Sequence, residues 1–390
     1  MARLGDYIEQ IRGVSYKPED VCTSQDEDAV AILRANNIQD DGLIFDDLIY
    51  VKKSKVANKQ YIQRGDIIVC ASSGSKSLVG KAAVANENMP ISFGAFCKVI
   101  RPKKLLPIYI GHYFQSPKYR NTISEMAGGA NINNIRNEHI DELDIAIVSE
   151  DEQEKIITEL DATSNLISLR KQQLSKLDEL VKSRFIEMFG NLVIGDKICT
   201  NKHKIGEIAS VTKLAGFEFT KYIQYKEQGE IIMLRGLNCK KGHLVLDDIK
   251  WIDKETSDLL PRSKLYYGDI LMTYAGTIGD VAMVDADDKY HLAPNVAKIT
   301  LTDKMAYNPV FLIHLFMYTT DYIMTFASVV AQASINMEKI RNFEYYFPSV
   351  EQQNAFATFV EQIDKSKFEI QKSLEKLETL KKSLMQKYFG

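Results

Sequence analysis

The stretch most similar to a nucleotide-binding loop runs from Gly74 to Lys81. A phosphate-binding loop ending in Gly80-Lys81 needs a glycine at position 75. It also needs a serine or threonine at position 82, whose hydroxyl binds Mg²⁺. Ser75 and Ala82 occupy these positions. We therefore do not expect ATP to bind here.

Other patterns that could support catalysis are also incomplete. The sequence has no HExxH motif, and its six histidines are scattered. No glycine-rich fingerprint follows a strand to hold a methyl donor. The run 308–311 (Asn-Pro-Val-Phe) lacks the second proline of an amino-methyltransferase motif. The five cysteines form no CxxC pair and are expected to be reduced core residues. We predict no catalytic site, no metal site and no bound cofactor.

The chain contains an internal repeat, which is the first pattern to seek in any long sequence. Short matches recur in the same order, and each pair is separated by 199 to 203 residues. The matched segments are 3–8 with 204–208, Leu33-Arg34 and Asn37 with Leu234-Arg235 and Asn238, 65–68 with 268–271, 131–133 with 334–336, Glu152-Gln153 with Glu351-Gln352, and Phe189-Gly190 with Phe389-Gly390. This order at nearly one spacing indicates a tandem duplication.

Each copy begins with a mixed segment, residues 1–149 (head 1) and 191–349 (head 2). Short β-rich runs such as 66–70 and 269–273 are broken by Gly, Asn and Asp, which is typical of buried strands. We therefore assign both heads to the α+β class, as globular domains of mixed α and β structure.

Each copy ends in a predicted long helix, residues 150–190 and 350–390. Neither 151–189 nor 351–389 contains Gly or Pro, so nothing local interrupts a helix. Apolar residues follow the three-and-four spacing of a coiled-coil seam. They are Ile156, Leu160, Ile167, Leu174, Leu177, Val181 and Met188 in the first helix, and Phe356, Val360, Ile363, Ile370, Leu374, Leu377, Leu384 and Tyr388 in the second.

A lone helix with one apolar stripe is unstable in water, so each long helix needs a partner. A helix of this length spans about 58 Å. We expect the two helices to pair antiparallel, which gives the duplicated chain an approximate two-fold axis. The predicted architecture is two α+β heads joined by an antiparallel coiled coil.

The overall composition is 45% hydrophobic and 26% charged, with a formal net charge of −3. No apolar run approaches the roughly 18 residues of a membrane helix, and the N-terminus has no secretory core. We expect a cytoplasmic protein. A net negative charge is unusual for an isolated DNA-binding domain, so any DNA face must be a local concentration of basic groups.

Two variable heads of about this size, each followed by a long helix, resemble the specificity subunits of Type I restriction–modification systems. The Gly-Asp-Ile-(Ile/Leu) strand starts at 65–68 and 268–271 are similar to landmarks of their target-recognition domains. So are the polar turns 129–133 and 332–336, and the run 347–352 that ends in Glu-Gln. The first copy lacks the proline of that run, at 147–153.

This resemblance implies that heads 1 and 2 are target-recognition domains, each of which reads one half of an asymmetric, bipartite site on double-stranded DNA. The helices would set the unread spacer and dock two modification (methyltransferase) subunits. These would supply S-adenosylmethionine binding and adenine methylation. Restriction subunits that use ATP and Mg²⁺ would complete a translocating endonuclease, while this chain itself stays non-catalytic.

Polar loop residues near the repeat landmarks are the candidates for DNA contact, because Arg, Asn and Gln can form paired hydrogen bonds with base edges. The candidates are Arg34, Asn37, Ser73, Lys76, Lys81, Asn131 and Asn133 in head 1, and Arg235, Asn238, Tyr274, Thr277, Gln332 and Asn336 in head 2. Structural roles compete with this interpretation: the arginines can hold turns, and the Asn and Ser residues can cap helices. Two heads that read different sequences should differ where they read, so loops not shared between the copies can hold the true readers.

Three other hypotheses remain open from the sequence. In the first, the chain is a protein-binding adaptor or scaffold whose heads grip proteins at a separation set by the coiled coil. In the second, it is a fragment of a fused restriction enzyme. In the third, it is an enzyme in its own right. Salt-dependent, sequence-selective DNA binding would favour the specificity subunit over the adaptor.

Overall fold

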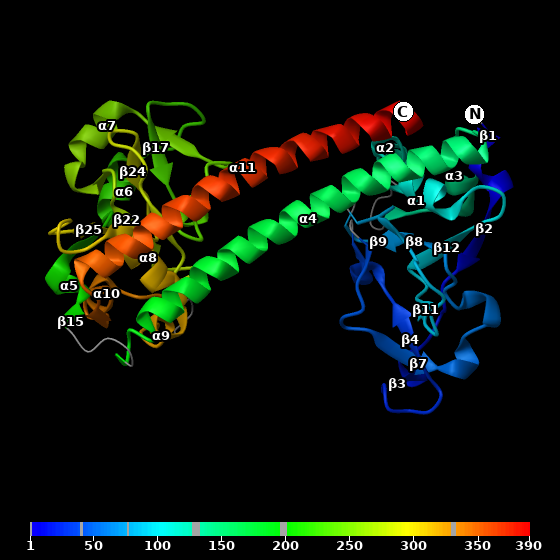
Figure 1. Ribbon diagram of the computed structural model, residues 1–390, viewed down its shortest axis with the longest axis horizontal. Helices are drawn as coiled ribbons and strands as arrows, with labels where there is room; N and C mark the ends of the chain where they lie inside the picture. The colour runs from blue at the N-terminus through cyan, green and yellow to red at the C-terminus, as the bar shows by residue number, and fades with distance from the viewer. Residues whose placement is uncertain (1, 40–41, 76–77, 127–132, 196–200, 329–332) are drawn as a thin grey trace. The chain divides into compact units, whose positions relative to one another are not determined.

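The computed structural model describes residues 2–39, 42–75, 78–126, 133–195, 201–328 and 333–390 (Figure 1). The chain forms two compact units. Unit 1 contains residues 1–172 and 371–390, and unit 2 contains residues 173–370. Each unit therefore holds one head together with a part of both long helices. In the described residues, no helix is long and apolar enough to cross a lipid bilayer.

Head 1 is built on two four-stranded sheets. The first has the order β10-β8-β12-β2, with every neighbour antiparallel, and the second has the order β11-β4-β7-β3. The strands are β2 (Ile8–Arg12), β3 (Val21–Cys22), β4 (Ala29–Leu33), β7 (Ile49–Lys52), β8 (Ile67–Cys70), β10 (Ala82–Val84), β11 (Ser92–Phe93) and β12 (Cys97–Pro102). Helices α1 (Pro107–Gln115) and α2 (Pro117–Met126) follow, and Tyr109, Tyr113 and Tyr119 from them are buried in the core.

Head 2 repeats the first sheet strand for strand, in the order β23-β22-β25-β16. Its second sheet, β21-β24-β17-β20, shares three strands with that of head 1, because β17 pairs parallel with β24 and antiparallel with β20, as β4 does with β11 and β7. The fourth strand is added at the opposite edge. The strands are β16 (Ala209–Lys213), β17 (Ile231–Leu234), β20 (Lys250–Ile252), β21 (Lys264–Leu265), β22 (Ile270–Thr273), β23 (Val281–Met283), β24 (Tyr290–Leu292) and β25 (Val296–Leu301).

The repeated Gly-Asp-Ile landmark forms the turn that starts the central strand of each head. Gly65 and Gly268 have φ angles of +86° and +84°, which favour glycine. The buried Asp66 carboxylate accepts a hydrogen bond from the Gln63 N–H at 2.8 Å, and Asp269 accepts one from the Tyr266 N–H at 2.9 Å. The structural role of this turn therefore explains why both copies share the landmark.

The two predicted long helices are confirmed. They are α4 (Glu150–Phe189), drawn in green in Figure 1, and α11 (Val350–Phe389), drawn in orange to red. Gly190 follows α4 with a φ of +63° and donates its N–H to the Ile186 carbonyl, as expected of a C-terminal cap. The predicted seam positions are all buried or half-buried.

In each unit the start of one long helix packs with the end of the other. In unit 1, Ile156 and Leu160 of α4 share a hydrophobic core with Met385 and Phe389 of α11. In unit 2, Phe185 and Phe189 of α4 pack against Phe356 of α11, with ring centroids 5.3 and 5.7 Å apart. The segments therefore run in opposite directions within each unit.

The terminal aromatic residues, which the seam pattern missed, anchor these helices in the heads. The Phe389 ring lies 5.3 Å from Tyr109 and 5.9 Å from Tyr113 in unit 1. The Phe189 ring lies 5.1 Å from Phe311 of α8 (Pro309–Tyr318) in unit 2. The repeated Phe-Gly pair thus completes the core of a head.

The repeat also requires a correction of register at the helix starts. Gln153 accepts a hydrogen bond from the Leu106 N–H and donates one to the Val148 carbonyl. Gln353 makes the same two bonds, with the Asn308 N–H and the Pro348 carbonyl. Gln353, and not Gln352, is therefore the counterpart of Gln153. The error arose because two glutamines stand side by side in the second copy.

Candidate nucleic-acid interface

Asn37 and Asn238 are fully buried and hold equivalent turns. The Asn37 amide oxygen accepts the Arg34 N–H at 2.8 Å, and its NH₂ group donates to the Asp46 carbonyl at 2.8 Å. The Asn238 side chain likewise bonds the Arg235 N–H and the carbonyls of Val245 and Asp248. Both amides are used inside the fold, so neither is placed to read a base.

Arg34 and Arg235 are fixed beside these turns. The Arg34 Nη2 donates to the carbonyl and the carboxylate of Asp47 at 2.6 and 2.7 Å. The Arg235 Nη2 donates in the same way to Asp248 at 2.8 and 2.7 Å. The side chains remain 33% and 21% exposed. Both arginines thus have a structural role, and part of each guanidinium still faces solvent.

In head 1 the structure brings the predicted residues Ser73 and Asn133 together. Strand β9 (Ser72–Ser73) pairs with β13 (Asn133–Asn134), and Asn133 is the register partner of Ser73. The Ser73 hydroxyl accepts the Ser75 N–H at 3.1 Å. Lys81, at the far side of this loop, is half-buried. Lys76 and Asn131 lie outside the described residues.

In head 2 the predicted residues Tyr274 and Thr277 lie in the loop after β22. The Lys213 ammonium lies 5.5 Å from the centroid of the Tyr274 ring, and Thr277 is exposed. Ala275 forms an isolated bridge with Ser334, so the polar turn before α10 (Met337–Arg341) adjoins this loop. Gln332 lies outside the described residues.

Asn336 caps helix α10, where its side-chain oxygen accepts the Lys339 N–H at 2.8 Å. The capping role that competed with DNA contact is therefore present, although Asn336 is exposed. Its counterpart before α3 (Asn137–Asp141) is Arg136.

The register of this turn also needs correction. The N–H of the buried Ile335 donates to the Tyr274 carbonyl at 2.8 Å, and the Ile135 N–H donates to the Ala71 carbonyl at 2.8 Å. Ile135 is therefore the counterpart of Ile335, and the segment equivalent to 334–336 is 134–136. The sequence match chose 131–133 because the run 131–135 contains Asn-Ile twice, three residues apart.

Backbone hydrogen bonds gather these loops at one place in each head, which we call the loop end. In head 1 the Phe96 carbonyl accepts the N–H groups of Ala71 and Ser72 at 2.9 and 3.0 Å, and the Gly94 N–H donates to Leu33, next to Arg34. In head 2 the Asn295 carbonyl accepts the Tyr274 N–H at 3.0 Å. The loop ends are residues 71–75, 94–96 and 133–136 in head 1, and 274–280, 293–295 and 333–336 in head 2.

Sequence reasoning missed Phe96 and Asn295 in these loop ends. Both are exposed, and the Phe96 side chain is among the most exposed apolar groups described, at 68%. The search followed residues that the copies share, whereas these two differ between the copies. The only signal in the sequence was therefore a difference in residue type at equivalent positions of the two copies. This signal can be seen only when the two copies are aligned in the correct register.

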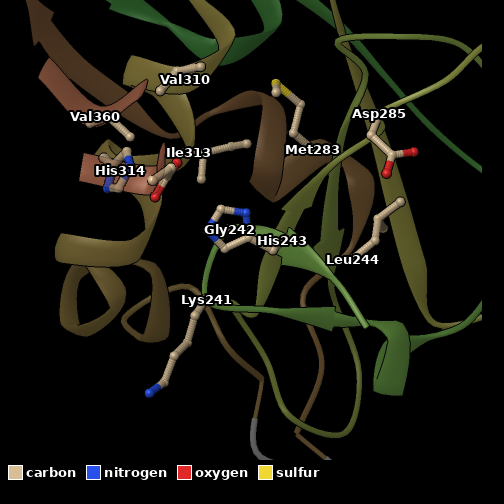
Figure 2. Close-up of a pocket in the computed structure, with 11 residues that line it drawn as sticks. Lys241, Gly242, His243, Leu244, Met283, Asp285, Val310, Ile313, His314 and Val360 are labelled. Carbon is tan, nitrogen blue, oxygen red and sulfur yellow. The ribbon is translucent and has the colours of Figure 1, made fainter. Parts of the chain in front are cut away.

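Unit 2 contains a pocket of about 290 Å³, which is lined in part by His243 and His314 (Figure 2). Figure 2 shows the His243 ring turned toward Ile313 and His314, while the Lys241 side chain extends away. Burial, together with the positive charges of His243 and Lys367, lowers the pKa of His314 to about 3. His314 is therefore a neutral imidazole, and its Nδ1 lies 3.2 Å from the Tyr318 hydroxyl. Within the described ranges, no group of three His, Cys, Asp or Glu residues is arranged to hold a metal ion.

The outer faces of the two long helices carry a repeated surface. In unit 2, Lys176, Leu180, Lys182 and Ser183 of α4 are exposed. In unit 1, the same residue types are exposed at 376, 380, 382 and 383 of α11. Leu180 is 46% exposed and its counterpart Leu380 is 47% exposed. We call these the helix surfaces. Core packing does not explain their identity, because their side chains face solvent.

Two like heads, two unlike loop ends and two like helix surfaces define a duplicated binding protein. A family profile described as "Type I restriction modification DNA specificity domain" matches residues 2–179 and again residues 200–382. The chain therefore belongs to the family of Type I restriction–modification specificity proteins.

Curated relatives agree with this assignment. The chain is 34% identical over 278 residues to the EcoKI specificity subunit of Escherichia coli K12, covering 69% of this chain and 60% of that protein. It is 42% identical over 173 residues to the StySPI specificity subunit of Salmonella potsdam, covering 44% and 37%. The chain thus spans less than two thirds of these two relatives. It covers 90% of the MjaVIII specificity subunit of Methanocaldococcus jannaschii, at 22% identity over 99% of this chain.

Solved structures show the same fold. The S subunit of a Type I restriction–modification system from M. genitalium aligns with a TM-score of 0.55 and 15% identity, covering 100% of this chain and 95% of that one. A chain from a study of complex assembly and conformational transition of the type I restriction–modification system aligns with a TM-score of 0.56 and 14% identity, covering 98% and 97%. At these identities the likeness concerns the fold alone.

Proposed function

We propose that this chain is the sequence-reading, non-catalytic subunit of a Type I restriction–modification complex. Each head binds one half of an asymmetric bipartite site on double-stranded DNA. The observation that carries the proposal is the family match to both copies, combined with loop ends that differ between otherwise similar heads. Two unlike loop ends on one scaffold suit two unlike half-sites.

DNA contact is assigned to the loop ends. Ser73, Tyr274, Thr277 and Asn336 lie in them and are exposed or half-exposed, and Lys81 flanks the first. Arg34 and Arg235 stay as candidates for phosphate contact, because each side chain is held in place by its aspartate and remains partly exposed, while the aspartate offsets its charge. Asn37 and Asn238 act indirectly by holding the turns. Lys76, Asn131, Asn133 and Gln332 stay as candidates from the sequence.

The long helices form the spacer of the proposed reader. Their opposite directions within each unit support an antiparallel coiled coil that extends through both units. A stiff connection makes the second half-site contact effectively intramolecular, so affinity is high only when the gap between half-sites matches the spacer. The unread gap is therefore a property of the helices, and the half-site sequences are a property of the heads.

The helix surfaces are proposed as docking sites for two modification subunits. The same exposed residue types occur once in each unit, which suits two copies of one partner. An exposed leucine flanked by lysines fits an apolar pocket with an acidic rim. These partners would supply S-adenosylmethionine binding and adenine methylation, and restriction subunits would supply ATP-dependent cleavage. Because the chain has a net charge of −3, we expect weak DNA binding by the chain alone.

The test is to express the chain with its modification partner in a host and to map methylated adenines across the genome. The expected result is one asymmetric sequence with two specified parts and an unspecified gap. Replacing residues 1–149 with head 1 of another family member should change one part only. Methylation without a bipartite sequence, or a change in both parts, would contradict the proposal. If the complex binds no DNA but the chain binds other proteins through its heads, the adaptor hypothesis is correct.

A further inference from the structure

Phe96 and Asn295 occupy the same backbone position in the two heads. Each lies immediately before the strand that crosses the first sheet, since Cys97 pairs with Cys70 and Val296 pairs with Thr273. The carbonyl of each accepts the N–H of the residue that follows the paired strand, namely Ala71 at 2.9 Å and Tyr274 at 3.0 Å. The equivalence therefore rests on hydrogen-bond register and does not depend on sequence similarity.

The same register extends through the preceding residues. The Gly94 N–H donates to the Leu33 carbonyl at 2.9 Å, and the Ala293 N–H donates to the Leu234 carbonyl at 3.2 Å. These leucines precede Arg34 and Arg235, whose aspartate contacts are alike in the two heads. The turn thus begins from the same position in both heads, beside the leucine that precedes the shared arginine.

The backbone of this turn is held firmly while the side chain at its tip is free of the core. In head 1 the Phe96 carbonyl accepts two N–H groups, and the Cys97 N–H donates back to the Gly94 carbonyl at 2.8 Å. A Cβ atom on Gly13 would lie 2.0 Å from the Gly94 carbonyl oxygen, so a neighbouring strand supports the turn from behind. In head 2 the tip residue Asn295 has a φ of +67°, a conformation that asparagine tolerates better than most residues, whereas Phe96 has no positive φ, so the two tips share their strand register but not their backbone conformation.

The two exposed side chains differ in the chemistry with which they can read a base. Phenylalanine forms no hydrogen bond but makes apolar contact with the 5-methyl group of thymine in the major groove. Asparagine offers a donor and an acceptor that match the N6 and N7 edge of adenine. In head 1 a firmly bonded backbone carries an exposed side chain outside the core, which is the arrangement expected of a specificity position. In head 2 the positive φ restricts the residue type at position 295, and asparagine meets that requirement while its side chain remains exposed.

We propose that Phe96 and Asn295 are equivalent base-reading residues, with Phe96 contacting a thymine methyl group in the half-site of head 1 and Asn295 contacting an adenine in the half-site of head 2. This inference rests on the proposed DNA-reading function. The shared arginine–aspartate pairs beside the two turns are alike in both heads, and the turn tips give each head its own base preference.

The experiment uses the complex of the full chain with its modification subunits, after the wild-type target has been mapped. Competition binding is measured with duplexes in which each thymine of the head 1 half-site is replaced in turn by uracil, which lacks only the methyl group. The wild-type complex should lose about four-fold in affinity at one thymine, the equivalent of one buried methyl group. The Phe96→Ala complex should bind the thymine and uracil duplexes equally.

The matched control is Phe368→Ala, because Phe368 on α11 is 67% exposed and lies outside both loop ends. It should keep the wild-type sensitivity to uracil. A wild-type complex that is indifferent to every uracil, or a sensitivity that persists in Phe96→Ala, overturns the assignment of Phe96. A uniform loss of affinity for all sequences in Phe96→Ala also overturns it, since that result indicates a contact without base preference.

The second arm uses Asn295→Asp, which keeps the side-chain shape but loses the amide donors. Preference for adenine at one position of the head 2 half-site should fall about ten-fold, with a gain for cytosine, whose amino group donates to a carboxylate. An unchanged preference overturns the assignment of Asn295. Failure of the proposed function is distinguishable, because the wild-type complex would then show no sequence-selective binding in either arm.

Discussion

The helix surfaces and the loop ends of this protein have diverged to different degrees since the duplication. Lys176, Leu180 and Ser183 on α4 are exposed and recur as the same residue types on α11. At the loop ends, exposed Phe96 stands where the other copy has Asn295. Neither set is constrained by core packing, so we attribute the difference to what each surface is proposed to bind. Identity between copies suits one partner bound twice, and divergence suits two different DNA sequences.

The largest expected effect concerns the aromatic anchors that give both copies the same architecture. Phe389→Ala should destabilise head 1 by about 3–5 kcal/mol, and Phe189→Ala should destabilise head 2 by a similar amount, because each leaves a cavity in a packed aromatic core. Hydrogen exchange followed by mass spectrometry would locate the loss of protection. Loss of protection in head 2 after Phe389→Ala would show that the repeat does not pack as described.

Next in size is the effect of placing a charge on a helix surface. Leu180→Glu or Leu380→Glu should each remove one of two modification subunits, with a loss of affinity of about 2 kcal/mol or more. Native mass spectrometry would count the subunits, and the double variant should bind none. Leu259→Glu is the control, since Leu259 is 66% exposed in head 2 but has no leucine counterpart in head 1. An equal loss of modification subunits in the Leu259→Glu control would contradict the proposal that the helix surfaces are the docking sites.

The corrected register at the helix starts predicts an intermediate effect. Gln353→Ala should cost about 1–3 kcal/mol, because it leaves the Asn308 N–H and the Pro348 carbonyl without their buried partner. Gln352→Ala should cost less than about 1 kcal/mol, since Gln352 is exposed and makes one long bond to the Ser349 N–H. Urea unfolding of both variants measures the difference. A larger cost for Gln352→Ala would support the register read from the sequence.

The effect of the smallest change in conditions, one pH unit, concerns unit 2. The pKa of His314 is about 3 in the folded chain against an ordinary value of 6.5, so the unfolded chain binds the proton first as the pH falls. The contribution of His314 to stability is therefore complete above pH 6.5, and it should fall by up to about 1.4 kcal/mol for each pH unit below that value until the pH reaches the folded pKa. His314→Gln should reduce by one the number of protons bound on unfolding, and the slope should fall accordingly. Of the charged groups that face this imidazole, His243 and Lys367 act in the same direction as burial and Asp178 opposes it, and an unchanged slope would contradict the lowered pKa of His314.

The sequence was sufficient for features that depend on local pattern. The absence of Gly and Pro from 151–189 and 351–389, with apolar residues at seam spacing, located both helices, and the repeat predicted two α+β heads. The residue-by-residue alignment of the two copies was harder to predict. Adjacent glutamines at 352 and 353, and two Asn-Ile pairs in 131–135, offer equal matches, and only long-range hydrogen bonds choose between them.

The candidate interface was harder to predict for a related reason. Shared residues were easy to find in the repeat, but Asn37 and Asn238 are shared because they hold turns. The residues proposed to read different bases differ in type, and Phe96 and Asn295 become comparable only once strand pairing aligns them. An exposed phenylalanine has no sequence signature, because its exposure depends on strands distant in the chain.

The central claim is that the heads determine the half-sites and the helices determine the gap between them. It is tested most directly by inserting four residues after Ser175 and four after Glu375, which adds about 6 Å to each helix. Methylated adenines are then mapped for the wild-type and lengthened chains with the same modification subunit. We predict unchanged half-sites separated by a gap that is longer by about one or two base pairs. Altered half-sites with an unchanged gap would contradict this division of roles.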